Sequence, residues 1–386
     1  MVAPPTLPAD ARLREYMTSA PIYSGGGGST NLVADSTIDV PENTQIVDLA
    51  IDYYGKRLAV CGDRVIFVYE ISTAGENIVS KLATGTEEAR LVARLEHPDV
   101  AGPLQQICWS DPTQGTMIAA CGACGSVMLW REGRPGDWSL VWRERLDGAA
   151  TTVQIGPKEF GLFIAAGSSS GLVTIFEAQN QTGPLMKIGV LKAHQNGVSS
   201  VSWAVPVSPA TLASGPAVQG GYMMPALRPR RLVSGGFDSN VKIWRWNADD
   251  KKWVEEGTLS SSGDSPPVPP NPEGDQHPSG GGSTVPPPTS HAGPVRSVAW
   301  RPNIGIPSNF LASGSEDGTC KIWVQTMEGL NWQNSATIHV ENNLPVNRVT
   351  WSVTGLCVCL SCGEEETVRI FKEDLDNQWR RVDRAE

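Results

Sequence analysis

The chain has 386 residues, and its 41 acidic and 31 basic side chains give a formal net charge of −10, which disfavours nucleic acid and anionic membrane as main partners. No stretch is apolar enough for a membrane-spanning helix and the first residues lack the layout of a secretion signal, so we expect a soluble intracellular protein. The 13 Trp, 40 Gly and 29 Pro favour short strands joined by turns.

A unit of three apolar strands recurs six times along the chain. Each copy has an alternating strand, a strand of small residues that ends at glycine, and an alternating strand that ends at an aromatic residue. The copies cover 46–69, 104–130, 150–176, 198–244, 295–323 and 346–371. A further strand is indicated in four copies by a tryptophan eight or nine residues later, at Trp138, Trp253, Trp332 and Trp379. Six units of four strands predict an all-β fold, an open six-bladed WD40 β-propeller.

Two insertions and an N-terminal extension interrupt the repeat. We expect a flexible extension over residues 1–44 and a propeller over 45–386, with insertions at 206–229 and 260–290. The second insertion is rich in Pro, Ser and Gly, so it cannot bury much apolar surface, and we predict a disordered surface loop. The alternative is that this Pro-rich stretch is a ligand for an aromatic groove.

A set of four hydrogen-bonding residues occurs at matching places in two units. The sets are His194, Ser234, Asp238 and Trp244, and His291, Ser313, Asp317 and Trp323. A Ser, His and Asp trio is also found in hydrolases, where His activates Ser. Here the trio is repeated, and each copy is accompanied by a Trp whose indole N–H needs an acceptor. The pattern therefore favours buried structural networks, and we expect no enzymatic activity from it.

Two C-x-x-C pairs, Cys121 with Cys124 and Cys359 with Cys362, raise the alternatives of a zinc site or a redox pair. The two pairs lie in different units, which argues against a shared metal. The repeat also aligns cysteines with small residues directly before a glycine, at Cys61, Cys121, Ala166, Ser234, Ser313 and Cys362. The sequence therefore predicts small buried side chains, with no metal and no cofactor.

Five pieces of the sequence are specific enough to indicate a family. They are IDYYGKRLAVCG (51–62), RRLVSGGFDSNVKIW (230–244), RPNIGIP (301–307), VTWSVTG (349–355) and VRIFKEDLDNQW (368–379). Together they resemble the small WD-repeat propeller of the COPII outer coat, which in many eukaryotes also serves the nuclear pore Y-complex. The resemblance covers roughly residues 40–383. The chain departs from it in the N-terminal extension, the Pro-rich loop, the turn at 122–125 and a degenerate third unit.

The resemblance implies an open ring into which a longer α-solenoid partner inserts strands as a seventh blade. The partner would be a coat protein of the COPII cage, a nucleoporin solenoid, or both, at the cytoplasmic face of ER exit sites, on COPII vesicles and at nuclear pores. The residues agree with this, because each unit supplies its own four strands and leaves an apolar face uncovered at each end of the series. We expect docking residues among Ile46, Val47, Ile66, Val68, Val368 and Ile370.

The expected function is that of a non-enzymatic scaffold in ER-to-Golgi transport and in the nuclear pore, without nucleic acid and without insertion into the membrane. One alternative is the sister propeller of the Y-complex and of a nutrient-signalling coat-like complex, which shares the blade count and the gap. The DNQW ending and the RPNIGIP turn favour the first family. Another alternative is an enzyme that uses the central funnel or the Ser, His and Asp trio.

Overall fold

The computed structural model describes residues 13–14, 37–38, 40–41, 44–71, 89–96, 102–179, 184–204, 206, 229–260, 289–302, 308–326, 331–363, 368–376 and 378–382. Nearly all of the predicted insertion at 206–229 and of the predicted loop at 260–290 lies outside these residues. At the end of that loop, however, Ser290 is fully buried, and its Oγ accepts a hydrogen bond from Val241 N at 2.8 Å. The packed structure therefore resumes before residue 291.

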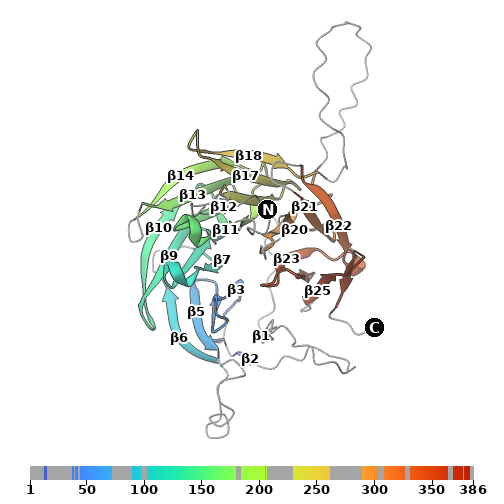
Figure 1. Cartoon of the computed structure of the whole chain (residues 1–386). Helices are drawn as coiled ribbons and strands as arrows, with labels where there is room; N and C mark the ends of the chain where they lie inside the picture. The colour runs from blue at the N-terminus through green and yellow to red at the C-terminus, as the bar shows by residue number, and fades with distance from the viewer. Residues whose placement is uncertain are drawn as a thin grey trace, which may run out of the picture.

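Six four-stranded antiparallel sheets follow one another around a ring (Figure 1). Within each sheet the strands pair in chain order, and the first strand lies near the centre of the ring while the fourth lies at its rim. Each repeat unit thus forms one blade from its own four strands. The predicted six-bladed propeller is confirmed.

Every blade runs from an innermost first strand to an outermost fourth strand. The first blade has β3 (Asp48–Ile51), β4 (Arg57–Cys61), β5 (Val65–Ile71) and β6 (Ala89–Glu96); the second has β7 (Leu104–Trp109), β8 (Met117–Gly122), β9 (Ser126–Arg134) and β10 (Asp137–Arg145). The third has β11 (Ala150–Ile155), β12 (Phe163–Ser168), β13 (Leu172–Ala178) and β14 (Leu185–Lys192); the fourth has β15 (Val198–Trp203), β16 (Arg231–Gly236), β17 (Val241–Asn247) and β18 (Lys252–Thr258). The fifth has β19 (Val295–Trp300), β20 (Asn309–Ser315), β21 (Thr319–Gln325) and β22 (Gln333–His339); the sixth has β23 (Val346–Trp351), β24 (Cys357–Cys362), β25 (Val368–Glu373) and β26 (Trp379–Arg381). Short 3-10 helices lie at Pro112–Gln114, Lys158–Phe160 and Glu341–Asn343.

Apolar clusters fill the spaces between successive blades. Five clusters each combine residues of two neighbouring blades, from the first and second to the fifth and sixth. Because side chains alternate along a strand, each strand contributes to both of its faces. In β4, Ala59 and Cys61 pack toward the second blade, whereas Leu58 and Val60 belong to a separate cluster on the opposite face. A blade in this ring therefore needs a cover on both sides.

Glycines in the second strands allow neighbouring blades to approach closely. A Cβ at Gly167, Gly235 or Gly314 would lie 2.6, 2.8 or 2.5 Å from a valine Cγ1 of the next blade. Contacts below about 3 Å are not tolerated between carbon atoms, so the valine packs where a side chain would otherwise be. Glycine at this position fixes the spacing between the third and fourth, fourth and fifth, and fifth and sixth blades.

The strand register corrects the predicted alignment of the cysteines. Cys121 pairs with Gln106 at the place where Gly235 pairs with Ser200, so Cys121 occupies the glycine position and not that of Ser234. The same comparison moves two more cysteines away from the predicted position, Cys61 and Cys362. The predicted alignment was wrong because it took the residue before the first glycine of each second strand as equivalent. The second strands end in different numbers of small residues, so these positions are not equivalent. All three cysteines are nevertheless fully buried.

The N-terminal extension contributes to the packed structure. β1 (Leu13–Arg14) and β2 (Thr37–Ile38) form a separate two-stranded antiparallel sheet. Ile38 is 5% exposed, and together with Val40 and Ile46 it packs on the face of the first blade that points away from the second. The expectation of a flexible extension up to residue 44 is therefore corrected at its end, where Ile38 and Val40 belong to the core.

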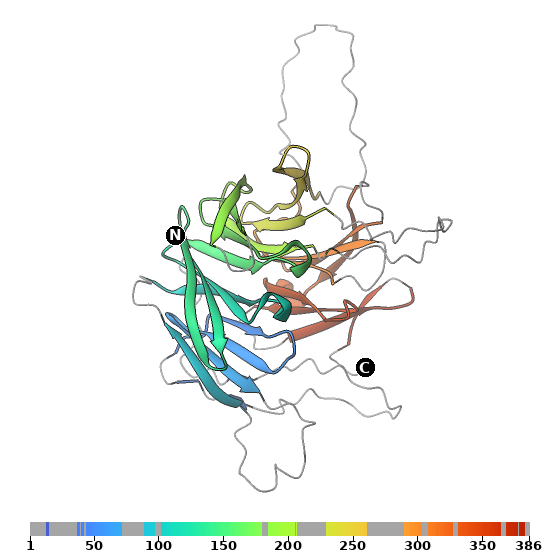
Figure 2. The same cartoon turned by 60° about the vertical axis from the view of Figure 1, so that its left-hand side comes forward.

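One position in the ring has no cluster between blades. Among the residues that the structure describes, none of the apolar clusters joins the sixth blade to the first. In Figures 1 and 2 the blue first blade and the red sixth blade flank this position, and the described part of the chain places no four-stranded sheet between them. We call this position the opening.

Replacing Gly314 with alanine tests the close approach of the fifth and sixth blades. The added Cβ would lie 2.5 Å from Val346 Cγ1 and 2.6 Å from Val349 Cγ2, in two buried residues. Overpacking of this kind costs about 1–3 kcal/mol, so we expect the free energy of unfolding to fall by that amount in urea titrations. Gly257→Ala is the matched control and should be nearly neutral, because its Cβ would have no atom within 4 Å. Equal stabilities of the two variants would contradict the packing argument.

Candidate functional site

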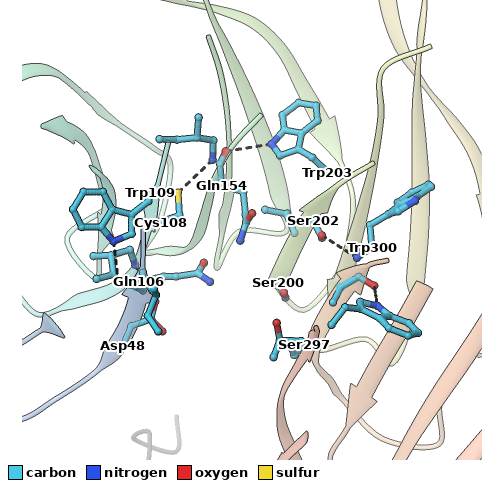
Figure 3. A pocket seen from close by; sticks show the side chains of 18 of the residues that line it. Asp48, Gln106, Cys108, Trp109, Gln154, Ser200, Ser202, Trp203, Ser297 and Trp300 are labelled. Carbon is cyan, nitrogen blue, oxygen red and sulfur yellow. Dashed lines mark hydrogen bonds between the residues drawn. The ribbon is translucent and has the colours of Figure 1, made fainter. Parts of the chain in front are cut away.

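The innermost strands of the blades enclose a channel of about 1150 Å³ along the ring axis. Polar side chains on these strands reach the backbone of the next blade (Figure 3). Asp48 Oδ2 accepts a hydrogen bond from Ile107 N at 3.0 Å, and Gln106 Oε1 accepts one from Val153 N at 2.9 Å. These oxygens satisfy N–H groups that would otherwise face the channel without a partner from their own sheet.

Hydroxyl groups continue the pattern in the later blades. Thr151 Oγ1 donates to the carbonyl of Val198 at 2.6 Å, Ser200 Oγ accepts from Val298 N at 3.2 Å, and Ser297 Oγ accepts from Val349 N at 3.1 Å. Consecutive blades from the first to the sixth are thus joined at the axis by one hydrogen bond or more. We call this series the inner ring.

One ion pair closes the inner ring across the opening. Arg348 Nη2 of β23 donates to Asp48 Oδ1 of β3 at 2.6 Å. Burial raises the pKa of Asp48, while the charge of Arg348 and the hydrogen bond from Ile107 N act in the opposite direction. The first and last blades therefore meet through a charged contact at the axis, whereas other neighbouring blades also share an apolar cluster.

We expect Arg348→Ala to destabilise the chain more at pH 7 than at pH 4. Burial raises the pKa of Asp48, so the ionised carboxylate is the costly form, and loss of Arg348 raises that pKa further. The stability associated with the protonated carboxyl is present at low pH and is lost as the pH rises through the folded-state pKa. Urea unfolding should show a loss of about 1 kcal/mol at pH 7 and less at pH 4.

The control for this ion pair is Arg348→Lys, which keeps the positive charge and should retain most of the stability. A loss that is the same at both pH values would show that Asp48 is not the group involved.

The two predicted hydrogen-bonding sets are assembled in the fourth and fifth blades. In the fifth blade, Trp323 Nε1 donates to Ser313 Oγ at 2.8 Å, and Ser313 Oγ lies 2.7 Å from His291 Nε2. His291 Nδ1 lies 3.1 Å from Asp317 Oδ2. The fourth blade repeats these three contacts at 3.0, 2.9 and 2.8 Å, through Trp244, Ser234, His194 and Asp238.

The serines of these sets are poorly placed for nucleophilic catalysis. Ser234 and Ser313 are both 0% exposed, and each hydroxyl oxygen already accepts a hydrogen bond from an indole. Burial lowers the pKa of His291 and favours its neutral form. With its proton on Nδ1, this imidazole donates to Asp317 and accepts from Ser313, so all groups of the set are satisfied. The arrangement ties a turn to the blade interior.

Acid should weaken the fifth-blade set. The ordinary pKa of His291 is 6.5 and burial lowers it, so the stability of the neutral form is present above pH 6.5 and is lost as the pH falls through the lower folded-state value. Burial alone would raise the pKa of Asp317, but hydrogen bonds from His291 and Thr319 outweigh burial and hold that pKa well below its usual 3.8. The loss therefore continues in stronger acid.

The measurement is the melting temperature between pH 7.5 and pH 5. We expect it to fall in the wild type and to fall less in His291→Gln, which has no titratable group at this place. Parallel curves would contradict the assignment to His291.

The two walls of the opening differ in what covers them. On the sixth blade, Phe371 packs toward the fifth blade, so its strand neighbours Val368 and Ile370 lie on the other face, where they are partly exposed. On the first blade, the face toward the opening is covered by the chain itself, through Ile38 and Ile46. Of the predicted docking residues, Ile46, Val368 and Ile370 thus lie at the opening.

The other three predicted docking residues lie on the wrong side of the first blade. Val47, Ile66 and Val68 pack in the cluster shared with the second blade, and the last two are fully buried there. In β5 the residues that alternate with them, Phe67 and Tyr69, belong to the cluster on the face toward the opening. The prediction was wrong because β5 is apolar on both faces. Its sequence therefore does not indicate which face points toward the second blade and which toward the opening.

Exposed apolar side chains beside the axis were not predicted. Leu49 and Ile51 of β3 are 43% and 44% exposed and line the channel. The turn that follows exposes Tyr53 and Tyr54, whose rings pack edge to face with centroids 5.2 Å apart. Two adjacent tyrosines in an otherwise polar turn were the signal that could have indicated this surface. The uncovered part of the first blade therefore lies next to the axis.

Comparison with known proteins gives the family. The model of the WD domain, G-beta repeat, matches residues 284–324, which include β19 and β20. The protein transport protein sec13 of Aspergillus oryzae is 31% identical over 348 residues, which cover 87% of this chain and 98% of that protein. The chain belongs to the SEC13 family.

Other SEC13 proteins match over a similar length. The protein transport protein sec13 of Emericella nidulans is 30% identical over 347 residues, 87% of this chain and 94% of that protein. The SEC13 homolog of Drosophila melanogaster is 27% identical over 346 residues, 89% of this chain and 82% of that protein. The resemblance found in the sequence is confirmed as a family relationship.

The described part of this SEC13-family chain holds no evident metal centre. Within the described ranges, no group of three or more His, Cys, Asp and Glu side chains could hold a metal ion. Burial raises the pKa of Cys121 well above its usual value, so this thiol stays protonated, and Cys124 Sγ lies 3.2 Å from Ser126 Oγ. None of the helices in the described residues is long and apolar enough to cross a bilayer.

Proposed function

We propose that this SEC13-family chain is a non-enzymatic scaffold subunit of a protein-transport coat and that it receives a seventh blade from an α-solenoid partner. The names of its SEC13 relatives support a role in protein transport. The observation that carries the proposal is the opening, because no apolar cluster of the described residues joins the sixth blade to the first.

The sixth blade supports a partner of β-structure. Its sheet is packed on one side by the fifth blade, and Val368 and Ile370 stand partly exposed on the other side. Between consecutive blades of this ring, the element that covers such a face is another sheet, packed face to face. A partner segment that forms strands would cover this face of the sixth blade as the sixth blade covers the corresponding face of the fifth.

The partner that we infer is a solenoid of the COPII cage, a nucleoporin solenoid, or both. The corresponding places are the cytoplasmic face of ER exit sites, COPII vesicles and the nuclear pores of the nuclear envelope. The net charge of −10 supports a protein partner over nucleic acid or an anionic membrane. The SEC13 names of the relatives favour this family over the sister propeller of the Y-complex.

Affinity capture from cells tests the proposal. We expect the wild-type chain to recover a longer α-solenoid protein, and co-expression with that protein to raise the melting temperature. Ile370→Asp places a charge on the sixth-blade wall and should weaken binding about tenfold or more, since a buried charge without a partner is costly. Val141→Asp is the matched control, because Val141 is 45% exposed on the outermost strand of the second blade and should not contact the partner.

Both variants must first show the wild-type melting temperature as free chains. A chain recovered without a solenoid, or equal binding by Ile370→Asp and Val141→Asp, would contradict the proposed blade in trans. Recovery of nucleoporins without coat proteins would restrict the proposal to the nuclear pore.

A further inference from the structure

The first blade buries an apolar face that no other blade in the described ranges covers. This face is formed by side chains of β4 and β5 that are at most 6% exposed: Leu58, Val60, Phe67, Tyr69 and Ile71. The residues packed on them come from the chain before the first blade and include Ile38, Val40 and Ile46. We call these three residues the cover.

We propose that the cover is an intramolecular occupant of the docking face, which an incoming seventh blade must displace. This inference rests on the proposed function, because it concerns the same opening. It adds that the free chain masks one of the two walls of the opening, so that the partner binds in competition with the chain's own N-terminal residues.

The cover and a seventh blade require the same surface. In the second blade, Met128 and Trp130 of β9 pack against the preceding blade. Strand register places Phe67 and Tyr69 at the equivalent positions of the first blade, because Cys61 pairs with Ile66 as Cys121 pairs with Val127. A blade that precedes the first in the ring would therefore pack on Phe67 and Tyr69, where the cover now lies.

The cover packs on the first blade through side chains and, among the described residues, is not part of a blade sheet. Among the described residues, β1 and β2 pair with each other and with no strand of the first or sixth blade. Within the described residues, moving Ile38 and Val40 away therefore breaks no hydrogen bond of a blade sheet, and it exposes apolar surface that an incoming sheet would bury again. Such a cover can leave without unfolding the propeller.

The uncovered part of the opening gives the partner a place to begin. In β3, Asp48 and Ala50 contact the second blade, so Leu49 and Ile51 alternate toward the opening, where they are 43% and 44% exposed. On the opposite wall Ile370 is partly exposed. A strand of the partner can contact Leu49 and Ile51 beside the axis while the cover is in place, and another can contact Ile370 farther out on the sixth blade. Displacement of the cover then extends the contact outward over β4 and β5.

The experiment compares the full chain carrying Ile38→Asp and Val40→Asp with the wild type. The control is Pro41→Asp, which adds one of the two negative charges to an exposed residue of the same segment. Two quantities are measured for each: the fluorescence of the apolar dye anilinonaphthalene sulfonate with the free chain, and the dissociation constant for the solenoid recovered by affinity capture. A second double variant, Ile38→Leu with Val40→Ile, tests rescue by apolar side chains.

We expect the charged double variant to increase dye fluorescence severalfold and to bind the solenoid about tenfold more tightly, because the competing closed state is removed. Pro41→Asp and the apolar double variant should match the wild type. Unchanged dye fluorescence would contradict the proposal that the cover masks the apolar face of the first blade. Increased fluorescence with unchanged or weaker solenoid binding would contradict displacement of the cover by the partner, but it would not contradict the proposed scaffold function. If neither the wild type nor any variant recovered a solenoid, both the displacement and the scaffold function would be contradicted.

Discussion

A sheet that is apolar on both faces is stable in water only when something covers each face, and this requirement governs the whole molecule. The second to fifth blades meet it with a neighbouring blade on either side. The two end blades have one neighbouring blade each. The first is completed by the chain's own Ile38 and Val40, while the sixth keeps Val368 and Ile370 partly exposed. The two walls of the opening thus differ. Burial of the exposed apolar side chains on the sixth blade by a partner would contribute favourable free energy of binding.

Much of the fold could be predicted because each blade repeats a local pattern. The tryptophans that indicated fourth strands pack edge to face on tryptophans of the first strands, with Trp138 on Trp109 at 5.9 Å and Trp379 on Trp351 at 5.8 Å between centroids. The Ser, His, Asp and Trp sets could be predicted for the same reason, since their spacing recurs in two blades. Repetition within one chain served as a substitute for comparison between chains.

The features that the sequence did not predict depend on the direction in which each face of a strand points and on the register between strands. Ile66 and Phe67 are both apolar and both buried, so their identity does not tell which of them faces the opening. The position of Cys121 required the pairing with Gln106, which depends on the register of two strands. Ile38 and Val40 are a short apolar pair in a segment without a repeat, and only packing on the first blade shows their role.

The hydrogen bonds of the inner ring join residues of neighbouring blades that are separated by very different lengths of chain. Gln106 and Val153 join neighbouring blades across 47 residues, whereas Ser200 and Val298 do so across 98, because both insertions lie between them. The entropic cost of closing a loop grows with the logarithm of its length, and a doubling adds only about 0.6 kcal/mol. A single hydrogen bond of ordinary strength offsets that increment. Segments between successive strands can therefore lengthen at little thermodynamic cost to the junctions at the axis.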